Sequence, residues 1–109
     1  MKFIILMTTY DKKELAMKNA SICINNSIAA CVNIIKISSI YSWNKKLENC
    51  NEFLTVFKTT NKNKQTLVDF IKKTHSYDTP EIIEIPAVSV DRKYYDWLIS
   101  QTSNVKTKS

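Results

Sequence analysis

Residues 29–60, which read AACVNIIKISSIYSWNKKLENCNEFLTVFKTT, decide the fold of this 109-residue chain. Apolar residues are frequent on both sides of a polar segment, Asn44-Lys45-Lys46, and this pattern predicts two β-strands joined by a turn. Each predicted strand is about twice the usual five or six residues long. A domain of this size cannot cover such a hairpin by itself. We therefore expect another copy of the same chain to cover it.

The segments on either side of the hairpin predict further strands and helices. Residues 2–8, KFIILMT, form an apolar run that is typical of a strand buried on both faces. Asp11 and Glu14 have the spacing of a capping box, which predicts that a helix begins there. After the hairpin, Asn61 or Asn63 is expected to cap a second helix with one apolar face.

The end of the chain completes the pattern. Residues 81–88 predict a fourth strand that has Pro86 at an edge or an end, and Asp91 begins a short third helix. The order β-α-β-β-α-β-α predicts an α+β, ferredoxin-like sandwich with two helices on one face of an antiparallel sheet. We assign this single domain to residues 1–102 and a polar tail to residues 103–109. The other face of the sheet would be uncovered in a single chain.

Composition limits the classes of partner. The net charge is +6, but the lysines are scattered and Arg92 is the only arginine, whereas readers of bases and phosphates favour arginine. Residues 51–58, NEFLTVFK, have a superficial similarity to the RNA-recognition octamer, without its basic first residue or its glycine. We do not expect nucleic acid as a partner, and an RNA-binding module that uses the sheet face is kept as an alternative.

Glycine is absent and cysteine occurs three times without C-x-x-C spacing. Positions that need a positive φ are therefore expected to fall on Asn or Asp, the next most tolerant residues. The odd cysteine count predicts reduced thiols and a cytoplasmic location. No apolar run reaches the length of a membrane span, so we expect no membrane association.

The sequence lacks the usual signals of an enzyme. Nucleotide and nucleophile motifs that require glycine cannot occur, and His75 is the only histidine. Potential metal ligands are present, but no local spacing assembles them into a site. The simpler interpretation of His75 is a residue at a helix C-terminus that interacts with the helix dipole. We expect no catalytic activity.

Several short segments occur in order over nearly the whole chain. They are residues 29–33 (AACVN), 39–43 (SIYSW), 45–48 (KKLE), Glu52, 58–60 (KTT), 75–77 (HSY), 79–83 (TPEII), Pro86, Tyr94 and 97–98 (WL). This ordered set resembles the CutA family, the divalent-cation tolerance proteins. The chain departs from the family at Lys45, where the family has a glycine at the hairpin tip, and at Met7, where some members have a thiol.

The resemblance implies a homotrimer in which long hairpins extend the sheets between subunits. It also implies a link to tolerance of copper and other divalent cations, no established reaction, and pockets in clefts between subunits. Matched position by position, it implies a ligand pocket formed by Tyr41, Trp43, Lys58 and Tyr77, with His75 and Glu81 as the metal ligands. Copper or another divalent cation would be the cofactor. A structural or signalling trimer with only incidental metal binding is the remaining alternative.

Overall fold

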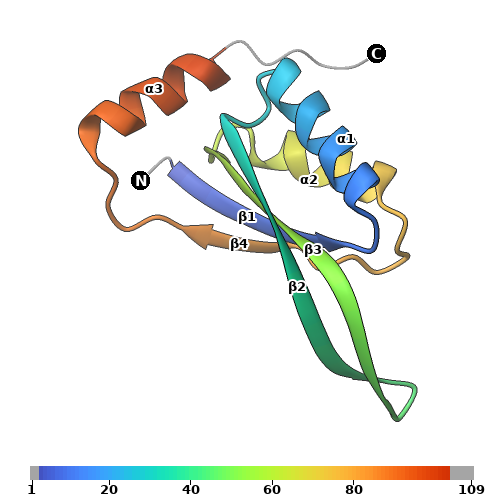
Figure 1. Cartoon of the computed structure of the whole chain (residues 1–109). Coiled ribbons are helices and arrows are strands. Elements are labelled where there is room, and N and C mark those ends of the chain that lie inside the picture. Colours follow the sequence, from blue (N-terminus) through green and yellow to red (C-terminus); the bar gives the residue numbers. More distant parts are fainter. Residues whose placement is uncertain (1–2, 104–109) are drawn as a thin grey trace.

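The computed structural model describes residues 3–103, and this part of the chain has four strands and three helices in the predicted order. The elements are β1 (Phe3–Tyr10), α1 (Lys13–Asn25), β2 (Cys31–Trp43), β3 (Lys46–Thr60), α2 (Lys64–Thr74), β4 (Ile83–Pro86) and α3 (Arg92–Thr102). The strands form one antiparallel sheet in the order β2-β3-β1-β4 (Figure 1). The prediction of a ferredoxin-like α+β fold is confirmed.

The main core lies between one face of the sheet and the helices α1 and α2. Leu6 and Phe57 are partners across β1 and β3, and both side chains are fully buried. They pack in one cluster with Cys23 from α1 and with Leu67 and Ile71 from α2. Successive strand residues point to opposite faces, so the alternate residues of the same strands form the other face. We call that second face the open face.

The helix starts only partly follow the sequence predictions. Asp91 caps α3 as predicted, because its carboxylate accepts the N–H groups of Lys93 and Tyr94. The capping box at Asp11 is wrong: α1 begins one residue after Lys12 and has no side-chain cap. The Asp11 carboxylate instead accepts the Ser76 hydroxyl at 3.0 Å, so a long-range contact replaces the local one.

Asn63 is the cap residue of α2, but its side chain does not cap the helix. The amide instead donates to the backbone carbonyls of Thr102, at 3.1 Å, and Ser27, at 3.4 Å. Asn63 is buried. It therefore ties the start of α2 to the end of α3 and to the loop before β2.

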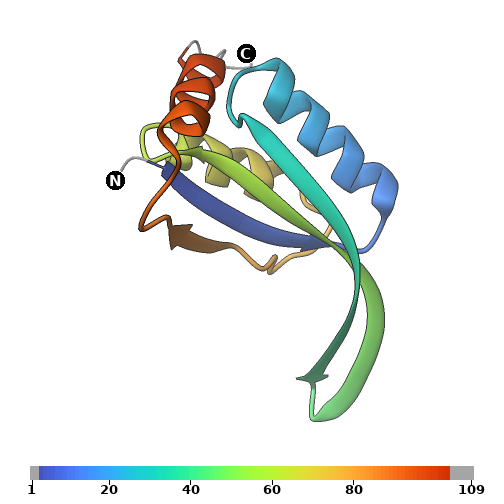
Figure 2. The ribbon, with the colours of Figure 1, turned by 60° about the vertical axis from the view of Figure 1, so that its left-hand side comes forward.

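The hairpin projects from the body of the molecule. β2 pairs with β3 as far as the turn, whereas β1 pairs with β3 only from Phe53 to Thr60. Residues 46–52 of β3 therefore have β2 on one side and, within residues 3–103, no strand on the other. Figure 2 shows this part of the hairpin curving away from the helices.

The turn of the hairpin consists of Asn44 and Lys45, with φ angles of 51° and 63°. Ser27, between α1 and β2, also has a positive φ of 59°. The expectation that Asn or Asp would occupy such positions is correct for Asn44 and wrong for Lys45 and Ser27. A two-residue hairpin of the favoured type needs positive φ at both positions, so strand geometry overrides the preference of the lysine side chain.

The open face is covered at one end only. There α3 packs on it through Leu98, which is buried with Phe3 and Ala30. Elsewhere on the open face, β1 carries Ile5 and Met7, β2 carries Ile35 and Ile37, β3 carries Leu54 and Val56, and β4 carries Ile83 and Ile85. The side chain of Ile35 is 49% exposed. The predicted uncovered face is therefore present, apart from the end beneath α3.

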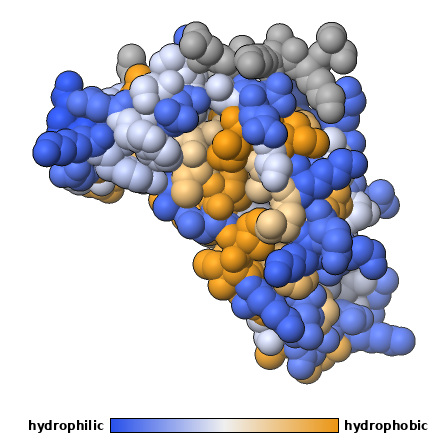
Figure 3. All heavy atoms as spheres, turned by 45° about the horizontal axis from the view of Figure 1, so that its top comes forward, coloured by the Kyte–Doolittle hydropathy of each residue, from blue (hydrophilic) through white to orange (hydrophobic). Residues whose placement is uncertain are grey.

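The remaining predictions concern boundaries and surfaces. β4 is shorter than the predicted 81–88, and the predicted tail at 103–109 lies, apart from Ser103, outside the described residues. Within residues 3–103, no helix has both the length and the apolar composition that crossing a bilayer requires. Figure 3 shows hydrophobic side chains gathered between α3 and α1 and continuing toward the hairpin.

Candidate functional site

Four side chains gather where the hairpin leaves the body of the sheet. They are Tyr10 at the end of β1, Glu52 on β3, His75 at the end of α2 and Tyr77 in the loop before β4. The ring of His75 stacks on the ring of Tyr10, with centroids 4.4 Å apart and planes 10° apart. The ring of Tyr77 also lies beside the ring of His75, with centroids 4.9 Å apart. We call these four residues the base cluster.

Tyr10 is the buried aromatic residue on which His75 stacks. Its side chain is fully buried, and its hydroxyl accepts a hydrogen bond from the Asn19 amide of α1 at 3.1 Å. The same amide donates to Thr74 of α2 at 2.9 Å. Burial raises the pKa of Tyr10, and the Asn19 hydrogen bond opposes that effect in part. Both helices therefore hold the surface on which His75 stacks.

Both ring nitrogens of His75 are used within the chain. Nδ1 accepts the backbone N–H of Tyr77 at 3.0 Å, so the proton of the neutral ring is on Nε2. Nε2 donates that proton to the carbonyl of Thr9 at 2.7 Å. Burial lowers the pKa of His75, and the Thr9 carbonyl and the negative charges of Asp11 and Glu52 oppose the shift. The ring orientation is thus set by two backbone groups.

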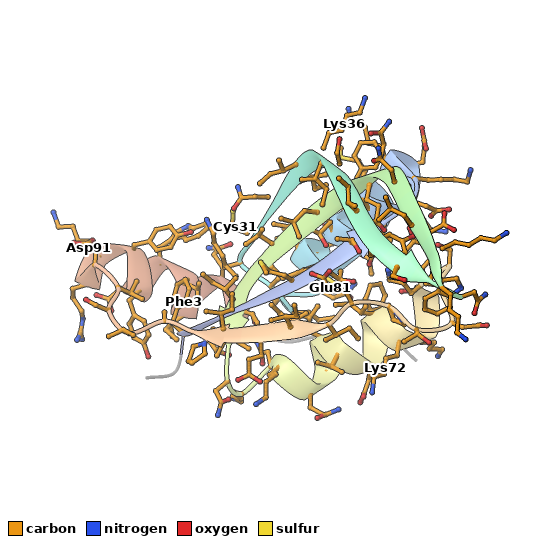
Figure 4. All side chains as sticks on the ribbon, turned by 90° about the horizontal axis from the view of Figure 1, so that it is seen from below. Phe3, Cys31, Lys36, Lys72, Glu81 and Asp91 are labelled. Atoms are coloured by element: carbon orange, nitrogen blue, oxygen red, sulfur yellow. The ribbon has the colours of Figure 1, made fainter. Side chains whose placement is uncertain are left out.

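This geometry bears on the metal ligands implied by the resemblance. A metal ion at His75 would have to replace its bond with Tyr77 or with Thr9, since a ligating nitrogen needs a free lone pair. Glu81 is exposed and lies between β4 and the hairpin (Figure 4). In the described part of the chain, no three His, Cys, Asp or Glu side chains come close enough together to hold a metal ion. The described residues of a single chain therefore do not form a complete metal site by themselves.

Glu52 and Tyr77 form the polar contact of the base cluster. The Tyr77 hydroxyl donates to the Glu52 carboxylate at 2.8 Å. Glu52 is only 7% exposed, which is unusual for a carboxylate. Burial, and next the hydrogen bond to Glu52, raise the pKa of Tyr77, so its hydroxyl remains a proton donor at neutral pH.

The aromatic residues of the hairpin lie on the same open face as Glu52. The hydroxyl of Tyr41 is 3.6 Å from the sulfur of Cys50, and this contact is the main cause of a raised pKa of Tyr41. Trp43 is 59% exposed, next to the turn. Both residues are exposed in the part of the chain that the structure describes, and a ligand or another subunit could contact them.

Lys58 is placed apart from the rest of the predicted pocket. It lies between Ile5 and Cys31 in the sheet, and its Nζ is 6.0 Å from the centre of the Tyr94 ring. It is six residues from Glu52 along β3, a separation of roughly 20 Å in an extended strand. In Figure 4, Cys31 and Phe3 mark this end of the sheet, beside α3.

The structure therefore brings His75 and Tyr77 together and leaves Tyr41 and Trp43 on the hairpin and Lys58 at the opposite end of the sheet. Sequence reasoning did not assign Glu52 to the site. A charged residue in the middle of a strand was the available signal, but only the tertiary fold brings the loop that holds Tyr77 against its side chain.

Comparisons with known proteins agree with the geometry of the fold. The sequence model of the family described as "CutA1 divalent ion tolerance protein" matches residues 4–101. The divalent-cation tolerance protein CutA of Thermus thermophilus is 33% identical over 99 residues, which are 90% of this chain and 96% of that protein. The chloroplastic protein CutA of Arabidopsis thaliana is 33% identical over 102 residues, 93% of this chain, which spans only 56% of that longer protein. The crystal structure of CutA1 from Ehrlichia chaffeensis superposes with a TM-score of 0.88 at 35% identity, covering 94% of this chain and 97% of the other.

Proposed function

This chain belongs to the CutA1 divalent ion tolerance protein family, and from that premise we propose that it works as a homotrimer that binds a small ligand or a divalent cation in clefts between subunits. The observation that carries the proposal is the division of the predicted pocket. Tyr77 and Lys58 lie at opposite ends of one sheet, so a single pocket containing both needs residues from two chains.

The surface of the single chain supports an association of this kind. An uncovered apolar sheet face and a long edge strand are features that soluble monomers usually avoid. Here the open face carries isoleucines on three strands, and β2 is an edge strand of 13 residues. Leu47, near the tip of the hairpin, is 78% exposed. Subunits that cover these surfaces would remove apolar area from water.

The oligomeric state is the first test. Native mass spectrometry of the purified protein should give the mass of three chains, and it reports bound ions in the same measurement. A monomer without metal would contradict the proposal. A trimer without any ion would favour the structural or signalling alternative. An RNA-binding module needs its open face free, so a trimer that still binds single-stranded RNA in a filter assay would contradict the arrangement proposed here.

The cation is tested separately. A site at His75 and Glu81 remains a prediction, and binding there has to compete with the two hydrogen bonds of the imidazole. Imidazole and carboxylate together suit copper or zinc. Calorimetric titration with each ion should show a lower affinity for His75→Ala and for Glu81→Ala, whereas Glu14→Ala, on the exposed side of α1, should match the wild type. Equal affinity in all variants would exclude this site.

A further inference from the structure

The open face carries two charged residues away from the hairpin tip, and neither has a partner of opposite charge in the described chain. These are Glu52 and Lys58, both on β3. The ion pairs among residues 3–103 are Lys64–Glu84 and Arg92–Asp96. The two charges on the open face are too far apart to pair with each other, since roughly 20 Å of extended strand separates them.

Glu52 is the more buried of the two charged residues. Its carboxylate is almost fully buried and is held by one neutral donor, the hydroxyl of Tyr77. A buried carboxylate is normally paired with a cation or coordinated to one, because a single neutral hydrogen bond replaces little of its hydration. Among residues 3–103, the Glu52 carboxylate therefore has no positively charged partner.

Lys58 has the opposite charge and lies on the same open face. Its side chain is half-buried between Ile5 and Cys31, and its nearest described interaction is the distant ring of Tyr94. The other lysine that the register places on this face is Lys46, which is exposed next to the turn. Lys58 is thus the ammonium group that would lose its water when another subunit covers the open face.

We propose that the ammonium group of Lys58 in one subunit pairs with the carboxylate of Glu52 in the next subunit, beside Tyr77. This inference rests on the proposed homotrimer and adds the contact that determines which ends of the subunits meet. In a homotrimer this contact is heterologous: the Lys58 end of one subunit meets the Glu52 end of the next, and the contact repeats identically around the closed ring. Covering the open face without this pairing would bury two uncompensated charges per subunit.

Charge exchange tests the pair directly. Glu52→Lys and Lys58→Glu should each raise the dissociation constant of the oligomer about 100-fold or more, because each variant places like charges together. The double variant Glu52→Lys/Lys58→Glu restores opposite charges at every interface and should regain most of the wild-type affinity. Masses are measured by light scattering over a dilution series, with far-ultraviolet circular dichroism as the check that each variant folds.

The matched control variants make the same changes of charge at positions away from the open face. Glu14→Lys, Lys18→Glu and their double variant change exposed residues on α1 and should leave the dissociation constant unchanged. Glu52→Gln and Lys58→Met are the milder forms, in case a reversed charge prevents folding. Each should weaken the oligomer at least tenfold while the chain stays folded.

Several results would contradict the proposed ion pair between Lys58 and Glu52. Wild-type dissociation constants for Glu52→Gln and Lys58→Met would do so, as would a double exchange no better than the single ones. Loss of divalent-cation affinity in Glu52→Gln but not in Lys58→Met would assign Glu52 to a cation. A wild-type chain that is monomeric at every concentration would instead refute the homotrimer itself, so the two failures can be distinguished.

Discussion

Removal of the Tyr77 hydroxyl is the most informative single perturbation of the base cluster. Tyr77→Phe keeps the ring against His75 but leaves the Glu52 carboxylate without its hydrogen bond. Hydrogen bonds to charged groups contribute about 1.5–3 kcal/mol, and the half-buried position of Tyr77 favours the lower end. We expect the free energy of unfolding to fall by about 1.5 kcal/mol, which corresponds to a drop in Tm of about 6–12 °C for a domain of this size.

Urea unfolding followed by circular dichroism, at one protein concentration for all variants, measures this loss. A double-mutant cycle with Glu52→Gln isolates the contact, and a coupling energy of about 1 kcal/mol is expected between the two positions. Tyr95→Phe is the matched control, because no hydrogen bond of its hydroxyl occurs among the described residues and its loss should be near zero. A coupling energy below about 0.3 kcal/mol would refute the assignment of Glu52 as the partner of Tyr77.

The pKa of His75, the positive φ of Lys45 and the burial of Cys23 can each be tested. Burial lowers the pKa of His75 in the folded state, so the unfolded state binds the proton more readily. The free energy of unfolding of the wild type should therefore fall as the pH drops below about 6.5. Urea unfolding from pH 8 to pH 5 should show a smaller loss for His75→Gln. Lys45→Gly should raise the free energy of unfolding by about 1 kcal/mol in thermal unfolding, since glycine adopts the positive φ of the turn without steric cost; no gain would show that the turn carries no strain. Burial raises the pKa of the Cys23 thiol to about 12, so a variant that keeps only this cysteine should resist a thiol reagent at pH 8 until urea unfolds it, and rapid labelling of the native chain would contradict the packing.

The position of His75 could be predicted, but its contacts could not. A histidine at the end of an amphipathic helix with Lys72 and Lys73 in the last turn is readable from local spacing. Its bond to Thr9 depends on how the end of α2 meets the end of β1, 66 residues earlier in the chain. Its bond to the backbone of Tyr77 is local, but it depends on the path of the loop after α2. This is why a residue that the resemblance assigned to a metal has both nitrogens engaged in the folded chain.

The strands, the helices and their order followed from the sequence, because hydrophobic periodicity and turn chemistry act over a few neighbouring residues. The excess length of residues 29–60 was visible in the same way, and from it we expected a cover supplied by another copy of the chain. Only the tertiary structure decided that Glu52 lies buried beside Tyr77 and that Lys58 lies roughly 20 Å away on the same face. The reason is strand register: a shift of one residue would exchange the two faces of β3, and that register is set by packing against β1 and the helices.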